Sequence, residues 1–299
     1  IFQMLKWFIR CLYRILTDAD RYLPKVQGQR NIIIVHGDTF STLLGAVAGR
    51  IRKMDVAHVE AGLRSYNIFH PFPEELTRIA VFRLARYAFC PGDWAYNNME
   101  KYPLQRVNTG ENTLLDAVKI ALRQEVAPSH RFSGGLYGVC SINRFENIFR
   151  KHRLLTIIRL LEQAALLHPM LFVLHPATRR RLNDYGLMSR LESNPRIQLL
   201  PRMGYIQFLH LVKDAVFVIT DGGGNQEELS YMAKPTLLMR KATERREGLG
   251  TTAVLGNYDA AILKDFLARL PRHPGDPVPL AGDTPSRVIY GNLKTYLLN

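Results

Sequence analysis

The stretch that decides the fold reads IIIVHGDT over residues 32–39, and AHVEAGLR follows over residues 57–64. Each begins as an apolar run typical of a buried strand and ends in a carboxylate beside a glycine, Asp38 in the first and Glu60 in the second. Another acidic stretch, PFPEE, occupies residues 71–75. Because ligands bind at the carboxyl ends of the strands in an open α/β sheet, we expect these acids to gather at one site.

Each of these acids also has an ordinary structural explanation. Asp38 could cap a helix that starts near Ser41, and Glu74 could cap or pair within a helix over residues 76–84. For a single acid that explanation is the simpler one. For Asp38, Glu60 and Glu74 together, with glycine, proline and histidine around them, we favour a catalytic site, because neighbouring carboxyl groups in different surroundings can divide acid and base duties.

The order of apolar and helical stretches predicts an α/β fold with two Rossmann-like domains, each a doubly wound parallel sheet. In the first half, strands are predicted over residues 31–35, 56–59 and 87–90, and helices over 42–52, 76–84 and 94–101. In the second half, strands are predicted over residues 136–140, 170–174, 197–199, 216–220 and 236–239, and helices over 154–167, 179–185, 205–212 and 225–233. Residues 125–135 are rich in proline, serine and glycine, so we place the boundary there, between domains 1–130 and 131–285.

The opening segment, residues 2–23, carries an apolar stripe with Lys6, Arg10 and Arg14 beside it. Such a helix could lie on a membrane surface. We expect instead an ordinary amphipathic helix that packs on the sheet before the first strand. No apolar stretch reaches the roughly 20 residues needed to cross a bilayer, so we expect no membrane span.

The composition favours a soluble, cytoplasmic enzyme. The chain has 299 residues, of which 47% are hydrophobic and 22% charged, and this is enough for two domains with their own cores. The three cysteines, Cys11, Cys90 and Cys140, are sparse and odd in number, which indicates reduced thiols rather than a disulfide framework. No cluster of cysteine and histidine has the spacing of a metal site, so we expect no metal.

The net charge of +14 does not by itself indicate a nucleic-acid partner. The positive residues are spread along the chain, no nucleic-acid-binding signature occurs, and the basic run at residues 179–181 is typical of a solvated helix face. We therefore expect no nucleic acid as a partner. A general positive potential suits an anionic small-molecule ligand.

The glycine-rich stretch DGGGN, residues 221–225, follows a predicted strand and opens a predicted helix. Glycines let phosphate oxygens approach the backbone, and a helix N-terminus offers free N–H groups. Gly222, Gly223 and Gly224 are therefore candidates for holding the phosphates of a nucleotide, although such a stretch is often only a tight turn. Glu228 follows one helical turn later, where a carboxylate would lie near a ribose.

Together these motifs resemble the UDP-N-acetylglucosamine 2-epimerase family, which has the architecture of the two-domain glycosyltransferase-B enzymes, with the domains facing a cleft. The resemblance rests on HGDT, HVEAGLRS and HPFPEE, and on further motifs in the family's order as far as about residue 256. These further motifs are FCP with Trp94, NTGENT with Asp116, NRFEN from Asn143, His175 with Pro176, Tyr205 with Phe208, TDGG with QEE, AKP, and TER. The resemblance also implies that a helical tail, residues 286–299, crosses back to the first domain.

The resemblance implies inversion of C2 of UDP-GlcNAc to give UDP-ManNAc, a precursor for cell-surface polysaccharides. The family is thought to eliminate UDP, to form a 2-acetamidoglucal, and then to add UDP back from the other face, which needs a base, an acid and a cradle for the diphosphate. Asp38, Glu60 and Glu74 match the family's acid/base carboxylates. Arg78 matches an arginine that serves the site, although it could simply pair with Glu74. No cofactor is implied, and we expect a homodimer.

In the second domain, the resemblance implies that Glu228 binds the ribose hydroxyls and that Phe208 lies beside the uracil. Core packing explains Phe208 equally well. Arg245, in the TER motif, is a candidate for binding an anion. Its alternative is a surface ion pair with Glu244 or Glu247.

Three features depart from the family pattern. The chain begins inside that pattern, so we expect the opening strand with its Gly-Thr-Arg-Pro-Glu loop to be missing and the first domain to be incomplete. Asn143 replaces a catalytic histidine next to Arg144, a candidate for binding UDP, and asparagine cannot carry a charge at neutral pH. Gly222 replaces a serine. These departures keep three alternatives open: a hydrolysing epimerase that releases ManNAc, a glycosyltransferase-B glycosyltransferase, and a catalytically weak relative that binds UDP-sugars.

Overall fold

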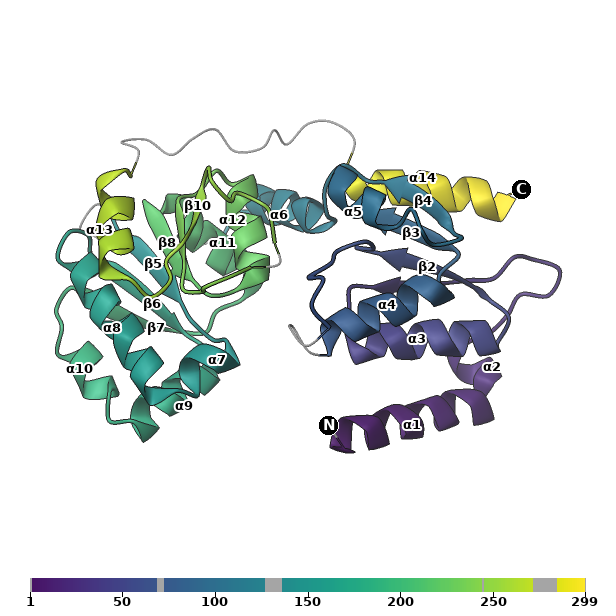
Figure 1. Ribbon diagram of the computed structural model, residues 1–299, viewed down its shortest axis with the longest axis horizontal. Coiled ribbons are helices and arrows are strands. Elements are labelled where there is room, and N and C mark those ends of the chain that lie inside the picture. Colours follow the sequence, from purple (N-terminus) through teal and green to yellow (C-terminus); the bar gives the residue numbers. More distant parts are fainter. Residues whose placement is uncertain (1, 69–72, 127–135, 244, 271–283, 299) are drawn as a thin grey trace. The chain divides into compact units, whose positions relative to one another are not determined.

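The computed structural model describes residues 2–68, 73–126, 136–243, 245–270 and 284–298. The chain divides into two compact units (Figure 1), and each has its own sheet. The first unit comprises Ile1–Asp116 and Gly282–Asn299, and the second comprises Ala117–Ala281. The boundary predicted between residues 130 and 131 lies outside the described residues.

In the first unit, the described strands form one parallel sheet in the order β1-β2-β3-β4. The strands are β1 (Ile32–His36), β2 (Asp55–Val59), β3 (Tyr87–Cys90) and β4 (Gln105–Asn108). The helices are α1 (Phe2–Thr17), α2 (Ala19–Tyr22), α3 (Phe40–Ile51), α4 (Glu74–Leu84), α5 (Gly92–Asn98) and α14 (Pro285–Leu298). Their alternation along the chain gives the parallel connections that the sequence predicted.

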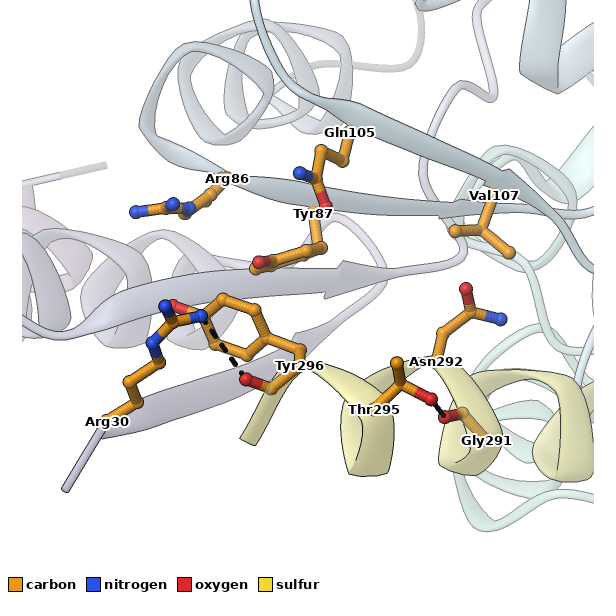
Figure 2. Close-up of a pocket in the computed structure, with 9 residues that line it drawn as sticks. All are labelled: Arg30, Arg86, Tyr87, Gln105, Val107, Gly291, Asn292, Thr295 and Tyr296. Carbon is orange, nitrogen blue, oxygen red and sulfur yellow. Dashed lines mark hydrogen bonds between the residues drawn. The ribbon is translucent and has the colours of Figure 1, made fainter. Parts of the chain in front are cut away.

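Helices cover both faces of this sheet. On one face, Val35 and Val56 pack with Ala46 of α3 and Val81 of α4. On the other face, strand residues pack against Ile289 and Leu293 of α14, which lies across from β3 and β4 (Figure 2). Strand residues such as Val56, Ala57, His58 and Val59 are therefore buried whichever face they point to, as expected of a parallel sheet.

The expectation that the opening helix packs on the sheet is wrong. Helix α1 packs on α3, with the rings of Phe8 and Phe40 6.4 Å apart, and α3 lies between α1 and the strands (Figure 1). The reason is the close fit of α3 on β1. A side-chain carbon on Gly49 would lie only 2.5 Å from Ile33, so the glycine lets α3 occupy the surface where α1 was expected.

In the second unit, the described strands form a parallel sheet in the order β10-β9-β8-β5-β6-β7. The strands are β5 (Gly138–Ser141), β6 (Met170–Leu174), β7 (Ile197–Pro201), β8 (Phe217–Thr220), β9 (Thr236–Leu238) and β10 (Ala253–Leu255). The helices are α6 (Leu114–Arg123), which begins in the first unit, then α7 (Phe145–Ile148), α8 (Lys151–Ala165), α9 (Pro176–Asp184), α10 (Met188–Glu192), α11 (Tyr205–Asp214), α12 (Gly223–Tyr231) and α13 (Ala260–Ala268).

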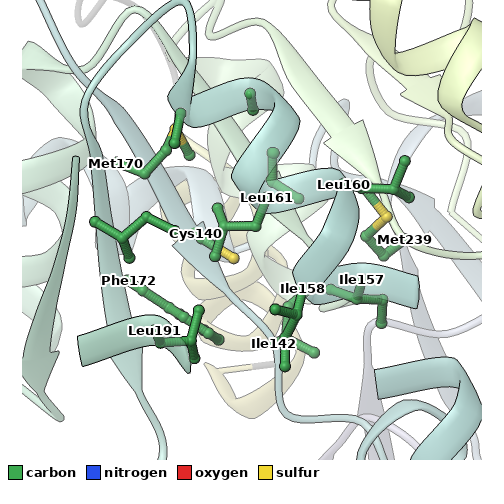
Figure 3. Packing of buried hydrophobic residues seen from close by; sticks show 14 of the residues in the cluster. Cys140, Ile142, Ile157, Ile158, Leu160, Leu161, Met170, Phe172, Leu191 and Met239 are labelled. Carbon is green, nitrogen blue, oxygen red and sulfur yellow. The ribbon is translucent and has the colours of Figure 1, made fainter. Parts of the chain in front are cut away.

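The core of the second unit lies between α8 and the sheet (Figure 3). Ile158 and Leu161 of α8 are fully buried against strand residues such as Phe172. Gly138 is required at the centre, because a side-chain carbon there would lie 2.6 Å from the ring of Phe217. The predicted fold class, an α/β protein with two doubly wound parallel sheets, is confirmed. Within the described residues, no helix is both long and apolar enough to span a membrane.

Candidate catalytic and nucleotide sites

Asp38 lies at the carboxyl end of β1, just after the left-handed turn at Gly37. It does not cap the following helix, because the hydroxyl of Thr39 accepts the hydrogen bond from the backbone N–H of Thr42 and α3 begins at Phe40. Arg78 Nη2 donates to Asp38 Oδ2 at 2.5 Å. The Asp38 side chain remains 27% exposed, so the carboxylate is oriented by the arginine and still open to a ligand.

Arg78 is held from its other side by Glu75. The Glu75 side chain is fully buried and accepts hydrogen bonds from Arg64 Nε at 2.5 Å, from the backbone N–H of Ser65 at 3.0 Å, and from Arg78 Nη1 at 3.5 Å. Burial alone would raise the pKa of Glu75, but the hydrogen bonds from Ser65 and Arg64 outweigh it and the pKa is lowered. Arg78 therefore pairs with Asp38 and Glu75, not with Glu74, the partner that the sequence alternative named.

Glu60 follows β2, the strand next to β1, and has a left-handed backbone with φ of 65°. Its Oε1 accepts a hydrogen bond from Asn112 Nδ2 at 2.8 Å, and its Oε2 lies 3.8 Å from His36 Nε2. A side-chain carbon on Gly37 would lie 3.4 Å from Glu60 Oε2. The loop that carries Asp38 therefore runs directly beside the Glu60 carboxylate.

A hydrogen bond from His58 holds the loop that carries Asp38. The ring is completely buried, and its Nε2 lies 2.8 Å from the carbonyl oxygen of Gly37. Burial lowers the pKa of His58 to about 4, so the imidazole is neutral at physiological pH. Because a carbonyl can only accept, the proton must be on Nε2, and His58 donates to the turn that precedes Asp38.

Glu74 is the first residue of α4, one helical turn before Arg78. It does not cap the helix, whose N-cap is Pro73. One of its carboxylate oxygens, Oε2, is buried and has no hydrogen-bond partner in the described structure. An unpartnered buried oxygen is energetically unfavourable unless a ligand or water satisfies it. Glu74 therefore has a carboxylate oxygen that is available to a ligand or to water.

The second unit holds a pocket of about 300 Å³ at the carboxyl ends of β5, β6 and β7. This is the edge of a parallel sheet where ligands bind. Three residues predicted from the sequence line it: Asn143, Phe208 and Glu228. The remaining lining residues are Ser141, Val173, His175, Arg202, Met203, Tyr205 and Asn225.

Glu228 and Phe208 form one side of this pocket. Glu228 is 7% exposed, and burial raises its pKa to about 7 against the lowering effect of a hydrogen bond from Tyr205. Phe208 is half-buried, whereas Leu209 and Val212 are the residues of the same helix that enter the core. Phe208 therefore faces the pocket, and the core-packing alternative does not describe its position.

Asp221 organises the opposite side. It is fully buried and accepts hydrogen bonds from the backbone N–H groups of Asn143 and Arg144, each at 3.0 Å, and from Asn147 Nδ2 at 2.8 Å. Burial raises the pKa of Asp221, and these hydrogen bonds oppose the rise. Since Asp221 binds the backbone of Asn143, the Asn143 side chain is left to line the pocket.

The glycine-rich turn begins α12, with Gly222 as its N-cap. The backbone N–H of Gly222 donates to Thr220 Oγ1 at 3.2 Å, and Asn225 Nδ2 donates to the same oxygen at 3.1 Å. A side-chain carbon on Gly224 would have open space within 4 Å. Of the stretch from Gly222 to Glu228, Asn225 and Glu228 reach the pocket wall.

Two predicted arginines lie in ion pairs instead of the pocket wall. Arg144 Nε lies 3.1 Å from Glu146 Oε1. Arg245 Nη1 lies 2.5 Å from Glu227 Oε2, and the Glu227 side chain is fully buried. This ion pair joins Arg245 to Glu227, a residue that the sequence alternative did not name, and Glu244 lies outside the described residues.

Sequence reasoning missed several residues that shape these sites. Glu75, His58 and Asp221 stand within the sequence motifs, but their roles depend on contacts with separate segments, which no local pattern gives. The position of Arg202 could have been predicted, because it directly follows β7 and therefore lies at the carboxyl edge of the sheet. Within the described residues, no group of three histidine, cysteine, aspartate or glutamate side chains could hold a metal ion.

Asp38 and Glu60 form a carboxylate cluster at the carboxyl edge of one parallel sheet, and a polar pocket lies at the carboxyl edge of the other. Together these features define a two-sheet α/β ligand-binding protein. Residues 9–272 match the sequence pattern of the family described as UDP-N-acetylglucosamine 2-epimerase. The chain therefore belongs to the UDP-N-acetylglucosamine 2-epimerase family.

Individual relatives agree with this assignment. The chain is 32% identical over 264 residues to the UDP-N-acetylglucosamine 2-epimerase of Methanocaldococcus jannaschii, a match that covers 84% of this chain and 71% of the relative. The crystal structure of the M. jannaschii UDP-GlcNAc 2-epimerase in complex with UDP-GlcNAc and UDP matches with a TM-score of 0.78 and 29% identity, over 98% of this chain and 81% of that one. The Neisseria meningitidis UDP-GlcNAc 2-epimerase bound to UDP-GlcNAc matches with a TM-score of 0.79 and 25% identity, over 99% and 82%.

Proposed function

We propose that this protein is a UDP-N-acetylglucosamine 2-epimerase that converts UDP-GlcNAc into UDP-ManNAc by elimination and re-addition of UDP. The observation that carries the proposal is the carboxylate cluster of the first unit, in which Asp38 is oriented by Arg78 and Glu60 by Asn112. Membership of the epimerase family and the UDP-GlcNAc seen in two related structures support the choice of substrate.

The chemistry uses these groups in two stages. A carboxylate removes the proton from C2, the C1–O bond to UDP breaks with its electron pair leaving on the diphosphate oxygen, and a C1–C2 double bond forms. A second carboxylic acid then returns a proton to C2 from the opposite face, and UDP adds back at C1. Glu74 suits proton transfer because its buried Oε2 has no partner in the described structure. Asp38 and Glu60 share the remaining acid and base duties.

The pocket of the second unit is the proposed site for UDP. Glu228 would accept hydrogen bonds from the ribose hydroxyls and Phe208 would lie against the uracil. Asn143 and Arg202, also in the pocket wall, would face the diphosphate, with the N-terminus of α12 adding free backbone N–H groups. The other predicted residues do not line the pocket and would act indirectly, through the backbone and the ion pairs that shape its wall. These residues are Arg144, Gly222, Gly223, Gly224 and Arg245.

We further propose that the enzyme is a cytoplasmic homodimer. The free cysteines support a reducing compartment. Exposed apolar side chains on α1, such as Leu5 at 50% and Ile9 at 58%, support an interface between two copies. Sedimentation equilibrium of the purified protein tests this, and a monomer at micromolar concentration would exclude a stable dimer.

A product assay on UDP-GlcNAc tests the proposed reaction, with chromatography that resolves UDP-ManNAc, free ManNAc and UDP. UDP-ManNAc is the expected product. Free ManNAc with UDP would point to the hydrolysing alternative, and release of UDP only with an added sugar acceptor would point to a glycosyltransferase. Asp38→Asn, Glu60→Gln and Glu74→Gln should each lower turnover by about 10²-fold or more. Normal turnover in all three would remove the catalytic assignment.

A further inference from the structure

The first unit contains a second pocket, of about 380 Å³, between α14 and the sheet (Figure 2). Tyr87 is the first residue of β3 and Gln105 the first of β4, so the pocket lies at the amino ends of these strands. Asp38 and Glu60 follow the carboxyl ends of β1 and β2. In a parallel sheet these are opposite edges, so this pocket is separate from the carboxylate cluster.

One end of the pocket is positively charged. Two guanidinium groups flank the ring of Tyr296, that of Arg30 at 4.9 Å and that of Arg86 at 5.7 Å from its centre. Arg86 is partly neutralised by Asp55, at 3.2 Å. Arg30 donates to the carbonyl oxygen of Tyr296 at 3.3 Å and makes no ion pair within the described part of the chain. The aromatic ring and a backbone carbonyl hold Arg30 in place, and its charge stays available to an anion.

The other end is polar and open because of a glycine. Gly291 lies inside α14, where glycine is unfavourable compared with alanine, and a side-chain carbon there would meet no atom within 4 Å. Gly291 lines the pocket, so any side chain at this position would extend into it. Asn292, the next residue of α14, presents a side-chain amide near Val107, and Gln105 presents another beside Tyr87 (Figure 2).

We propose that this pocket binds a sugar-sized anion, with its phosphate or carboxylate on Arg30 and Arg86 and its hydroxyl groups on Gln105 and Asn292. The volume is at the lower end of the roughly 300–1,000 Å³ of typical small-molecule sites, which suits a monosaccharide carrying one acidic group. Arginine is the side chain best shaped for a phosphate or a carboxylate, and amides bind hydroxyl groups as both donors and acceptors.

Isothermal titration of the full chain tests the proposal, with saturating UDP present to occupy the pocket of the second unit. The probes are glucose 1-phosphate, glucuronate and uncharged glucose. Saturable binding is expected for glucose 1-phosphate or for both anions, and not for glucose. The relative affinity of the two anions decides between a phosphate and a carboxylate.

Three variants make the test specific to this pocket. Arg30→Gln should weaken binding by about tenfold or more, because a charge-assisted hydrogen bond is lost. Gly291→Leu should abolish binding by filling the pocket, with circular dichroism to confirm that the protein is folded. Lys294→Gln, which removes an exposed charge from α14 outside the pocket, should bind as the parent does.

The proposal is overturned if neither anion gives saturable binding up to about 10 mM, because a dissociation constant above that concentration is too weak for a specific site. It is also overturned if Arg30→Gln and Gly291→Leu bind as tightly as Lys294→Gln. Neither result depends on epimerase activity, because the readout is binding and all of the altered residues lie away from the proposed catalytic and UDP sites.

Discussion

At the scale of single residues, the arrangement around Arg78 shows how a buried group can govern an exposed one. Asp38 is open to solvent and can meet a ligand, but its position depends on Arg78, and the position of Arg78 depends on the buried Glu75. A carboxylate without a proton is the form that holds two arginines, and the lowered pKa of Glu75 keeps it in that form. Glu75 is therefore a positioning residue for the carboxylate cluster.

Glu75→Gln should lower both stability and turnover. Replacing one partner of a buried ion pair by a neutral amide costs about 3 kcal/mol in the free energy of unfolding. Because the pKa of Glu75 is below its usual 4.5 in the folded chain, its contribution is present above that pH and lost as the pH falls through the folded value. The difference in urea stability between parent and variant should therefore shrink as the pH falls below 4.5. Glu100→Gln, an exposed acid, is the control, and equal losses in both variants would refute the role.

Asn143→His should raise turnover. Asp221 binds the backbone of Asn143, so the side chain can change without disturbing that anchor. An imidazolium would replace a neutral hydrogen bond to the leaving diphosphate by a charge-assisted one, a gain of about 1–3 kcal/mol or one to two decades in rate. The gain should fade as the pH rises past the histidine pKa of about 6.5. A flat or lower kcat, measured by the product assay, would mean that asparagine serves this enzyme's own chemistry.

Glu228 should make nucleoside binding depend on pH. Its pKa of about 7 means that the carboxylate is protonated below neutrality and charged above it. A charged carboxylate accepts stronger hydrogen bonds from ribose hydroxyls, so uridine should bind up to about tenfold more tightly at pH 8 than at pH 6. Uridine is the probe because it has no phosphate that titrates in this range. Glu228→Gln should give a flat profile, and the same slope in parent and variant would assign the effect to another group.

At the scale of elements, apolar runs predicted most strands and their parallel order, because buried strands need near-continuous hydrophobic residues. Strands β4 and β10 were not predicted. The sequence of β4, QRVN, has a single apolar residue because it lies at the edge of its sheet, and β10 spans only Ala253–Leu255. Helices α7 and α10 were missed as well, because Phe145–Ile148 and Met188–Glu192 are too short for a helical period to show.

Close packing inside one element is open to a direct test. Gly138→Ala places a methyl group 2.6 Å from the Phe217 ring and 2.7 Å from the sulfur of Met170, in a fully buried position. Such overpacking should lower the free energy of unfolding by about 1–3 kcal/mol. Gly291→Ala, where the added carbon meets open space within a helix, should instead raise it by about 0.5–1 kcal/mol. Chemical denaturation measures both, and similar effects from the two changes would contradict the packing argument.

At the scale of the whole molecule, the sequence predicted which edges of the two sheets would carry the sites. It predicted the side-chain contacts within those sites less well. Asp38, Glu60 and Glu228 were identifiable because each follows a strand or a glycine turn in a recognisable motif. Glu75, Asp221 and the pairing of Arg245 with Glu227 depend on side chains brought together from separate segments. No single stretch of sequence contains that information, so the pairing of Arg245 with Glu227 could not be predicted from its motif, and the binding of an anion by Arg245 stays a prediction.

The two units should respond separately to changes that act on one of them. Each has its own buried core, so calorimetry should resolve two unfolding transitions. UDP at about 100 times its dissociation constant should stabilise the second unit by about 2.7 kcal/mol and raise the midpoint of one transition. Gly138→Ala should lower that same transition, and Glu75→Gln should lower the other. If UDP and both substitutions all move one common transition, then the units unfold together, and the stability of the carboxylate cluster is coupled to nucleotide binding.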